Sequence, residues 1–333
     1  MMSFDILGTG SCLPRRKVGN DELSQFLDTS DEWISQRVGV LERCVCTTET
    51  TAELAHKAAL SALDKGNVAP GDLDMIVCAT VSADNSAPSL ACSVQMMLGA
   101  LCPAMDINAA CSGFIYALDT AAGFFARGAR RILVIGAERL SKHINWKDRS
   151  TAVIFADGAG AMVLGEGDAY LSSKLNAKGN ASVLGIPNHA GDSPFYTNGS
   201  ADPFIYMNGQ ETFKFAVKAM CKDLTDVTRS AGLTMDDIAW IVPHQANARI
   251  IDSAAKKLGI DPGRCCMNIE RVGNTSAASV PILADELCSS GKLREGDNIA
   301  FCSFGAGLTS AACIIKWKGK ENGRTGENNR HTG

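Results

Sequence analysis

Three polar side chains that could carry out acyl chemistry stand beside apolar stretches of this chain. Cys111 lies in "DINAACSGF", where small residues flank the thiol. His244 follows an apolar run in "IVPHQANARI", and Asn274 follows a glycine in "RVGNTSAASVP". A cysteine thiolate attacks thioesters, while His and Asn side chains can donate hydrogen bonds to an oxygen that gains negative charge. The three residues therefore form a candidate Cys/His/Asn catalytic set.

Each of these residues also has an ordinary structural explanation. Free cysteines are usually small buried core residues, a single histidine is more often structural, and Asn274 suits a simple turn. Their combination favours an active site. Papain-like proteases use the same residues in the same chain order, but their C-G-[SA]-C-[WY] signature is absent from "NAACSG".

The first half of the chain alternates buried strands with helical patterns. "LDMIVCATV" (73–81) and "RRILVIGAE" (130–138) predict strands, and "SLACSVQMMLGA" (89–100) predicts a helix. A second helix is expected to start at Cys111, directly after the strand-like "AMDIN". Its backbone N–H groups and dipole would then favour the thiolate form of the cysteine.

Glycine-rich segments close both halves of the chain. "AVIFADGAGAMVLGEG" (152–167) predicts two strands joined by a turn, and "DNIAFCSFGAGLTSAACIIKW" (297–317) predicts the same arrangement. The second half also contains a strand at 237–245 and helices at 246–260 and 276–293. We infer an internal duplication of one α/β unit, with a largely buried, parallel-rich sheet and helices on both faces.

The pattern divides the chain into three parts. Residues 1–170 form the half with the candidate nucleophile, and residues 171–317 form the half with His244 and Asn274. The stretch from about 168 to 212 is rich in Asn, Gly, Ser and Pro and predicts loops. The polar segment 318–333 predicts a disordered tail.

Composition excludes several classes of protein. The 32 basic and 36 acidic residues give a formal charge of −4, which argues against a nucleic-acid partner. No apolar stretch is long enough for a membrane span, and no signal peptide is evident. The thirteen cysteines include C-x-C and adjacent pairs but lack zinc-site spacing, so no metal is expected. We predict a cytoplasmic protein with reduced thiols and no membrane association.

The three motifs resemble those of one family of condensing enzymes. "DINAACSGF", "VPHQANARII" and "GNTSAASVP" are similar to the active-site motifs of β-ketoacyl-ACP synthase III, which starts type II fatty acid synthesis. "LGTGSCLP", "TSDEWISQRVGV", "FADGAGAMVLG" and "FGAGLTS" extend the match over about residues 4–317. The resemblance implies an α/β protein with the thiolase fold, in which two duplicated halves form a five-layer αβαβα sandwich. It also implies a homodimer.

The resemblance implies an acyltransferase of lipid metabolism with a two-step reaction. Cys111 would attack an acyl-CoA thioester and release CoA. Malonyl-ACP would then lose CO2, and its enolate would take the acyl group to give β-ketoacyl-ACP. The acyl carrier protein and acyl-CoA are the implied partners, and no cofactor is required.

Further site residues follow from the resemblance. The backbone N–H groups of Cys111 and Ala306 would form the oxyanion hole; relatives often carry Gly at position 306, but a backbone donor survives in Ala306. Trp33 and Arg149 would stack on the CoA adenine. Other residues that match the CoA channel are Arg37, Gly209, Phe213, Ala246 and Asn247. Lys214 and Arg249 match positions that meet the carrier protein, although a lysine there also suits a merely solvated face.

Ala87 stands where some acetyl-selective relatives carry a phenylalanine that reaches the partner subunit's acyl pocket. A smaller side chain there favours longer or branched primers. Three other hypotheses about function remain open. The chain could supply starter units for polyketide or other secondary metabolism, it could be a degradative thiolase, or it could bind CoA or the carrier protein without chemistry. The "FGAGLTS" turn lacks a thiolase's second cysteine, and Asn274 argues against an elongating synthase with two histidines.

Overall fold

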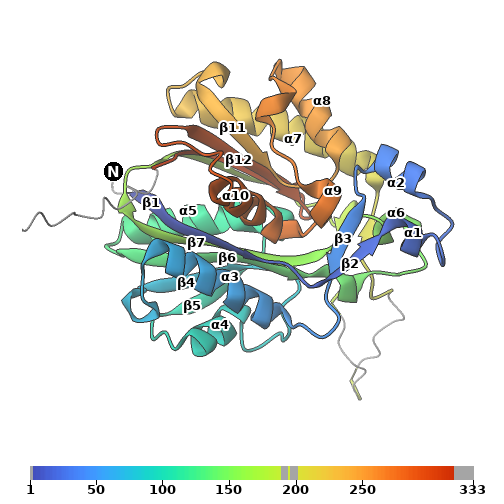
Figure 1. Cartoon of the computed structure of the whole chain (residues 1–333), viewed down its shortest axis with the longest axis horizontal. Helices are drawn as coiled ribbons and strands as arrows, with labels where there is room; N and C mark the ends of the chain where they lie inside the picture. The colour runs from blue at the N-terminus through green and yellow to red at the C-terminus, as the bar shows by residue number, and fades with distance from the viewer. Residues whose placement is uncertain (1–2, 189–193, 196–201, 319–333) are drawn as a thin grey trace, which may run out of the picture.

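Two β-sheets lie face to face, with helices between them and helices outside each sheet, so five layers are stacked (Figure 1). The computed structural model describes residues 3–188, 194–195 and 202–318. The predicted thiolase-type five-layer α/β sandwich is thus the fold of the chain. The predicted tail lies outside the described residues except for Lys318, whose ammonium group lies 3.3 Å from the Asp5 carboxylate.

Both sheets are mixed rather than parallel-rich, which corrects the expectation from sequence. The first sheet has the order β1-β7-β6-β4-β5, and only β4 pairs in parallel, with β5 and β6. The second has the order β11-β12-β13-β8, and only β11 and β12 pair in parallel. The strands of the two sheets are β1 (Ser3–Cys12), β4 (Met75–Ala79), β5 (Ala104–Ile107), β6 (Arg131–Arg139), β7 (Asp157–Gly167), β8 (Tyr170–Ala177), β11 (Ile238–Pro243), β12 (Asn298–Gly305) and β13 (Thr309–Lys316).

Helices cover both faces of each sheet. In Figure 1, α3 (Thr51–Gly66) and α4 (Leu90–Leu98) lie below the first sheet, and α7 (Gly209–Ser230) and α8 (Ala248–Leu258) lie above the second. Between the sheets lie α5 (Gly113–Phe125) and α10 (Ser279–Ser289). Close layer packing depends on small residues: a Cβ on Gly10 would lie 2.3 Å from the Ala58 carbonyl oxygen of α3.

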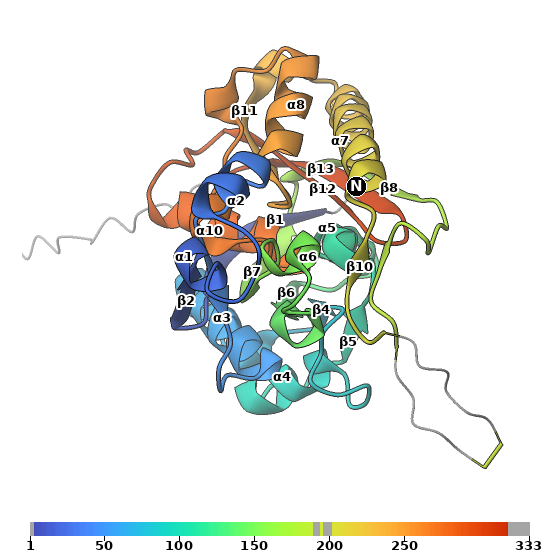
Figure 2. The same cartoon turned by 90° about the vertical axis from the view of Figure 1, so that its right-hand side faces the viewer.

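Short elements cover one end of the sandwich (Figure 2). They are β2 (Arg16–Gly19), α1 (Asn20–Leu23), α2 (Asp31–Arg37), β3 (Glu42–Val45), α6 (Arg149–Ala152), β9 (Leu184–Gly185), β10 (Tyr206–Met207) and α9 (Ile269–Val272). The fully buried Arg43 connects these short elements, because its guanidinium donates to the Val18 and Val153 carbonyls and to Asn20 Oδ1. The 3-10 turns are η1 (Pro70–Asp72), η2 (Ala110–Ser112), η3 (Leu140–His143), η4 (Met235–Asp237), η5 (Pro262–Arg264) and η6 (Ser276–Ala278).

Two predictions about local structure were wrong. Residues 152–167 do not form two strands around a turn; after α6, the segment continues into the single strand β7. Its glycines serve layer packing, because a Cβ on Gly160 would lie 2.7 Å from the Ile282 backbone nitrogen of α10. Residues 168–212 are not all loop either, since β8 forms an edge of the second sheet through its pairing with β13.

The two halves repeat the same arrangement, as predicted. The strands β1, β7, β6 and β4 of the first sheet correspond in order to β8, β13, β12 and β11 of the second. A parallel bridge between Ile241 and Cys265 stands where the first sheet has β5. Each central helix follows a 3-10 turn, and the first residues of these turns, Ala110 and Ser276, both have a φ of 48°.

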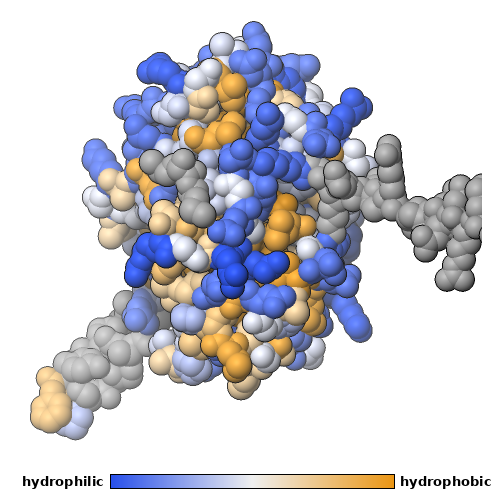
Figure 3. Space-filling view, turned by 90° about the vertical axis from the view of Figure 1, so that its left-hand side faces the viewer, coloured by the Kyte–Doolittle hydropathy of each residue, from blue (hydrophilic) through white to orange (hydrophobic). Residues whose placement is uncertain are grey.

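The helices of the described residues include no candidate membrane span. No helix there combines the length and the apolar character that crossing a bilayer requires. Hydrophilic side chains also interrupt the apolar surface on the face shown in Figure 3. All thirteen cysteines are free, and nine of them are buried.

Candidate active site

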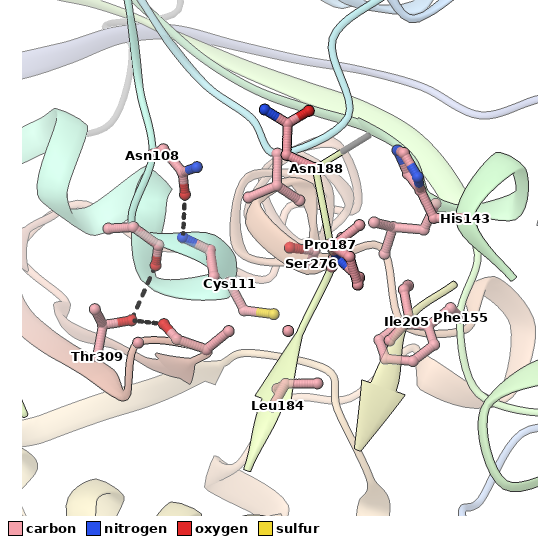
Figure 4. A pocket seen from close by; sticks show the side chains of 18 residues that line it. Asn108, Cys111, His143, Phe155, Leu184, Pro187, Asn188, Ile205, Ser276 and Thr309 are labelled. Atoms are coloured by element: carbon pink, nitrogen blue, oxygen red, sulfur yellow. Dashed lines mark hydrogen bonds between the residues drawn. The ribbon is translucent and has the colours of Figure 1, made fainter. Parts of the chain in front are cut away.

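Cys111 lies in η2, between the end of β5 and the start of α5. The turn begins at Ala110, whose left-handed backbone is uncommon for a residue with a side chain and costs on the order of 1 kcal/mol. Two hydrogen bonds hold it: the Thr309 hydroxyl donates to the Ala109 carbonyl at 3.0 Å, and the Ala110 N–H donates to Asn108 Oδ1 at 3.3 Å. Figure 4 shows the Cys111 sulfur pointing into a cavity, with Ser276 and Leu184 nearby.

Burial controls the ionisation of Cys111. Desolvation raises the pKa of the thiol to about 12, although the Ser276 side chain and the Cys111 backbone N–H oppose the shift. The expected thiolate at a helix start is therefore corrected for the ligand-free site, because desolvation outweighs the helix terminus.

The backbone of residues 305–306 passes directly over Cys111. A Cβ on Gly305 would lie 2.7 Å from the Cys111 backbone nitrogen, so only glycine fits without a shift. Ala306 lines a cavity together with Cys111. The two backbone N–H groups predicted to form the oxyanion hole, those of Cys111 and Ala306, thus belong to neighbouring segments.

His244 is held in a buried position just beyond β11. Its backbone N–H donates to the Cys302 carbonyl of β12 at 2.8 Å, and its ring Nδ1 lies 2.7 Å from Ser279 Oγ. The Phe304 ring packs against the imidazole in an edge-on arrangement, with centroids 5.3 Å apart. Burial lowers the pKa of His244 to about 3, so the imidazole is neutral near pH 7 and carries one N–H.

Asn274 is fixed by its own backbone and by the next turn. Its N–H donates to the Ile154 carbonyl at 3.0 Å, and its carbonyl accepts from the Ala156 N–H at 2.8 Å. The side-chain Oδ1 accepts from the Ser276 N–H at 2.8 Å. Since that bond identifies the oxygen of the amide, the amide NH2 is left as the free donor.

One cavity of about 250 Å³ brings Cys111, His244 and Asn274 together. Its wall is mostly apolar and includes Phe304 and Gly305. Of the residues predicted to bind CoA, the wall contains Trp33, Gly209, Phe213, Ala246 and Asn247.

Two predicted CoA residues lie beside this cavity rather than in its wall. The Arg149 guanidinium carbon stands 5.0 Å from the centroid of the Trp33 ring. The same guanidinium donates to the Asp28 carbonyl at 2.5 Å. Arg37 contributes its carbonyl, which accepts from Asn247 Nδ2 at 3.1 Å.

A second cavity, of about 500 Å³, also has Cys111 in its wall (Figure 4). Apolar side chains dominate its wall, and they include Val81, Leu140, Phe155, Leu184 and Ile205. Cys111 lines both cavities, so a group carried on its sulfur could reach either. Ala87 is exposed in the single chain and lines neither.

The predicted carrier-protein residues lie on the outer helices. Lys214 of α7 is exposed and pairs with Glu211 at 3.0 Å, and Arg249 is exposed in the first turn of α8. Lys214 also borders an open groove of about 780 Å³ between α7 and α8, together with Lys218, Lys222 and Lys257. Phe213 lines both this groove and the cavity of about 250 Å³.

Sequence reasoning missed several residues that shape the site, among them Ser276, Ser279, Phe304 and Gly305. All four lie within or beside the quoted motifs, so their positions, though not their contacts, could have been read from the sequence. Glu138 was missed as well. This buried carboxylate accepts hydrogen bonds from the Val81 N–H and from the Ser82 hydroxyl, and burial raises its pKa to about 7.

Within the described residues, no group of three or more His, Cys, Asp or Glu side chains is arranged to hold a metal ion. The described site therefore consists of a thiol, a neutral imidazole, an amide and backbone donors.

The chain is similar to known proteins over nearly its whole length. Family models described as 3-oxoacyl-[acyl-carrier-protein] synthase III and its C-terminal part match residues 105–179 and 228–317. The chain is 47% identical over 323 residues to a β-ketoacyl-[acyl-carrier-protein] synthase III from Caldanaerobacter subterraneus, a match that covers 94% of this chain and 97% of that protein.

Solved structures extend the similarity to three dimensions. The 3-oxoacyl-[acyl-carrier-protein] synthase III of Aquifex aeolicus superposes with a TM-score of 0.89 at 40% identity, covering 95% of this chain and all of the other. The priming β-ketosynthase of the R1128 polyketide pathway superposes with the same TM-score at 32% identity, covering 95% and 97%.

Proposed function

Because the chain belongs to the β-ketoacyl-ACP synthase III family of condensing enzymes, we propose that it joins an acyl-CoA primer to malonyl-ACP and initiates fatty acid synthesis. The products are β-ketoacyl-ACP, CoA and CO2. The observation that carries this proposal is the single cavity lined by Cys111, His244 and Asn274. The proposed chemistry uses only these side chains and backbone donors, and it needs no cofactor.

The first half-reaction transfers the acyl group to Cys111. The sulfur attacks the thioester carbonyl, the bond from the carbonyl carbon to CoA breaks, and CoA leaves as the free thiol with the proton that Cys111 gives up. Negative charge collects on the carbonyl oxygen in the tetrahedral intermediate. The N–H groups of Cys111 and Ala306 are proposed to bind that oxygen.

The second half-reaction forms the new carbon–carbon bond. Malonyl-ACP loses CO2, and the electron pair of the broken bond becomes an enolate whose carbon attacks the acyl-Cys111 carbonyl. The Cys111 sulfur leaves as the thiolate and takes a proton from water. The His244 ring and the Asn274 amide are proposed to donate hydrogen bonds to the enolate oxygen, a role that suits a neutral imidazole.

The wall of the smaller cavity suits the long arm of CoA. Trp33, Phe213 and Ala246 give it an apolar surface, and Asn247 adds a polar group. At the exposed end, the Arg149 guanidinium carbon lies 5.0 Å from the Trp33 ring centroid, so it would move outward by about 2 Å for an adenine ring to insert between these two planar groups.

The lysine-lined groove between α7 and α8 supports docking of an acidic carrier protein. The groove meets the cavity at Phe213, so an arm anchored on the groove could enter toward Cys111. Lys214 and Arg249 are the proposed contacts, and Lys257 lies on the same groove. Ion pairs between these basic side chains and acidic residues of the carrier protein would steer association, and they would weaken as the salt concentration rises.

A homodimer is proposed from the free edge of the first sheet. The strand β5 ends that sheet and is only half-buried, and such an edge favours pairing with another strand. Nearby, Met96 of α4 is 74% exposed and Leu101 is 93% exposed. Pairing there would cover these side chains. Ala87, which is exposed in one chain, is proposed to face the partner's acyl cavity in a cytoplasmic dimer.

Incubation with acyl-CoA and intact mass spectrometry test the proposal. We expect adducts from acetyl-, butyryl-, isobutyryl- or octanoyl-CoA that are absent from Cys111→Ser, followed by β-ketoacyl-ACP formation with malonyl-ACP. The absence of both acylation and malonyl-ACP decarboxylation would point to a binding protein instead.

Primer choice bears on the second candidate, a starter-unit synthase of polyketide metabolism. The cavity of about 500 Å³ leaves most of its volume empty around an acetyl group, which favours longer or branched primers. Similar kcat/KM values for acetyl- and isobutyryl-CoA would support this preference, whereas strict acetyl selectivity would contradict it.

A further inference from the structure

The hydrogen bond between His244 and Ser279 determines which ring nitrogen can act on substrate. Nδ1 lies 2.7 Å from Ser279 Oγ, while Nε2 makes no hydrogen bond within the described part of the chain. The ring lines the cavity with Cys111 and Asn274. Since a neutral imidazole has a single N–H, the nitrogen that faces substrate is either a donor or an acceptor, never both.

The Ser279 hydroxyl has one hydrogen and two possible acceptors. One is His244 Nδ1 at 2.7 Å, and the other is the Ser276 carbonyl at 2.9 Å. If the hydroxyl donates to Nδ1, the ring proton sits on Nε2, and the ring offers a donor to the cavity. If the hydroxyl donates to the carbonyl, Nδ1 carries the proton, and Nε2 offers only a lone pair.

The surrounding bonds favour the first arrangement. The Ser276 carbonyl already accepts the backbone N–H of Ser279, so it keeps a donor when the hydroxyl turns away. The hydroxyl oxygen can still accept from the Gln245 N–H, which lies at 3.5 Å. Because Nδ1 has a partner in both arrangements, the distances decide: 2.7 Å between Oγ and Nδ1 suits a hydroxyl donor, whereas a ring N–H donor typically lies about 2.9–3.0 Å from its acceptor.

We propose that Ser279 is a positioning residue whose hydroxyl donates to His244 Nδ1 and so keeps the ring proton on Nε2, facing the malonyl-derived enolate. The catalytic role of this hydrogen bond rests on the proposed condensing function, because the bond explains why His244 can stabilise an enolate. It also completes a pattern: the Ser276 N–H orients the Asn274 amide, and the Ser279 hydroxyl orients the imidazole three residues later.

The direct test is nitrogen NMR of the full-length protein labelled with 15N-histidine. The His244 signals are assigned by their loss in His244→Gln, and long-range proton couplings identify the protonated nitrogen. We expect Nε2–H in the wild type and a shift toward Nδ1–H in Ser279→Ala. Protonation on Nδ1 in the wild type would overturn the inference, as would an unchanged tautomer in Ser279→Ala.

Kinetics separate this role from a structural one. In Ser279→Ala, the malonyl-ACP decarboxylation rate should fall about tenfold, while Cys111 acylation by acyl-CoA changes less than about twofold. Ser279→Thr, which keeps the hydroxyl, should restore decarboxylation. Ser303→Ala is the matched control, because Ser303 is equally buried and its hydroxyl has no partner in the described structure.

The outcomes distinguish this inference from the proposed function. Equal losses in acylation and decarboxylation, with no rescue by threonine, would mean a structural role and would overturn the inference alone. A wild type that neither acylates Cys111 nor decarboxylates malonyl-ACP would overturn the proposed function, and the tautomer measured by NMR would still decide the role of Ser279.

Discussion

Adding one methyl group at Gly305 should disable acyl transfer. The Cβ of alanine at this position would lie 2.7 Å from the Cys111 backbone nitrogen and 3.2 Å from the Cβ atoms of Ala110 and Cys111. An ordinary contact of this kind is about 3.4 Å or longer, so η2 would have to move by roughly 0.5 Å or more. This displacement would move the Cys111 N–H, which is proposed to bind the thioester oxyanion.

The expected loss follows from the value of one oxyanion-hole donor. Removing such a donor costs on the order of 10²- to 10³-fold in rate, or about 3–4 kcal/mol of transition-state stabilisation. Overpacking would add about 1–3 kcal/mol of lost folding stability. We therefore expect Gly305→Ala to fold with a lowered melting temperature and to acylate Cys111 at least about 100-fold more slowly.

Single-turnover acylation followed by intact mass spectrometry measures this rate directly. Malonyl-ACP decarboxylation should fall much less, since the His244 ring and the Asn274 amide do not depend on the Cys111 N–H. Gly71→Ala is the control, because a Cβ there meets no atom within 4 Å. Acylation of Gly305→Ala at the wild-type rate would refute the assignment of the Cys111 N–H to the oxyanion hole.

Four further outcomes follow from the site and its surroundings. Trp33→Ala should raise the KM for acyl-CoA about tenfold with little change in kcat, and steady-state kinetics with a pantetheine thioester that lacks the nucleotide should show a much smaller effect. Lys214→Glu should raise the KM for malonyl-ACP severalfold at low salt and leave Cys111 acylation intact; an effect that does not shrink as salt is added would contradict electrostatic docking. Because burial keeps His244 neutral, with a pKa of about 3, malonyl-ACP decarboxylation should not decline as the pH rises through about 6.5, and a decline in the measured pH profile would indicate that an imidazolium is required. Burial raises the pKa of Glu138 from 4.5 to about 7, so the folded state holds this proton more tightly; the free energy of unfolding in urea should therefore fall between about pH 4.5 and 7. Glu138→Gln should remove that slope.

The strands and helices next to the catalytic motifs could be predicted because their apolar patterns are local. The 73–81 segment contains the fully buried β4, and α8 ends at Leu258, where the expected Gly259 caps it in the left-handed region at φ 67°. The order of elements also indicated the duplication correctly. These features depend on side-chain periodicity and backbone freedom, which a sequence displays directly.

The errors arose where distant residues decide the outcome. Glycines in 157–167 predicted a turn. Positions 158 and 160 instead hold glycine because α10, more than 100 residues away in the sequence, packs across β7. The ionisation of Cys111 was also misjudged, because a helix start is visible in the sequence and the desolvation of the sulfur is not. The contacts of Ser276 and Ser279 could not be predicted for the same reason.

Cross-packing between the two halves explains why the site needs both. A Cβ on Gly136 of β6, in the first half, would lie 2.4 Å from the Ala277 carbonyl of η6 in the second. The reverse contact joins Gly305 of β12 to the Cys111 nitrogen of η2. Each half therefore packs directly against the turn of the other half.

The two equivalent turns, η2 and η6, nevertheless have different roles in the site. Cys111 is the second residue of η2, and the second residue of η6 is Ala277, so only one of the two equivalent turns carries a nucleophile. The other turn orients the donors instead, since the Ser276 N–H holds the Asn274 amide and Ser279 holds His244. A second cysteine at the Ala277 position would bring no second nucleophile, because that side chain is buried in the central core cluster and lines neither cavity. The duplication thus places two similar turns, η2 and η6, side by side. They form an active site because one carries the nucleophile and the other orients the hydrogen-bond donors.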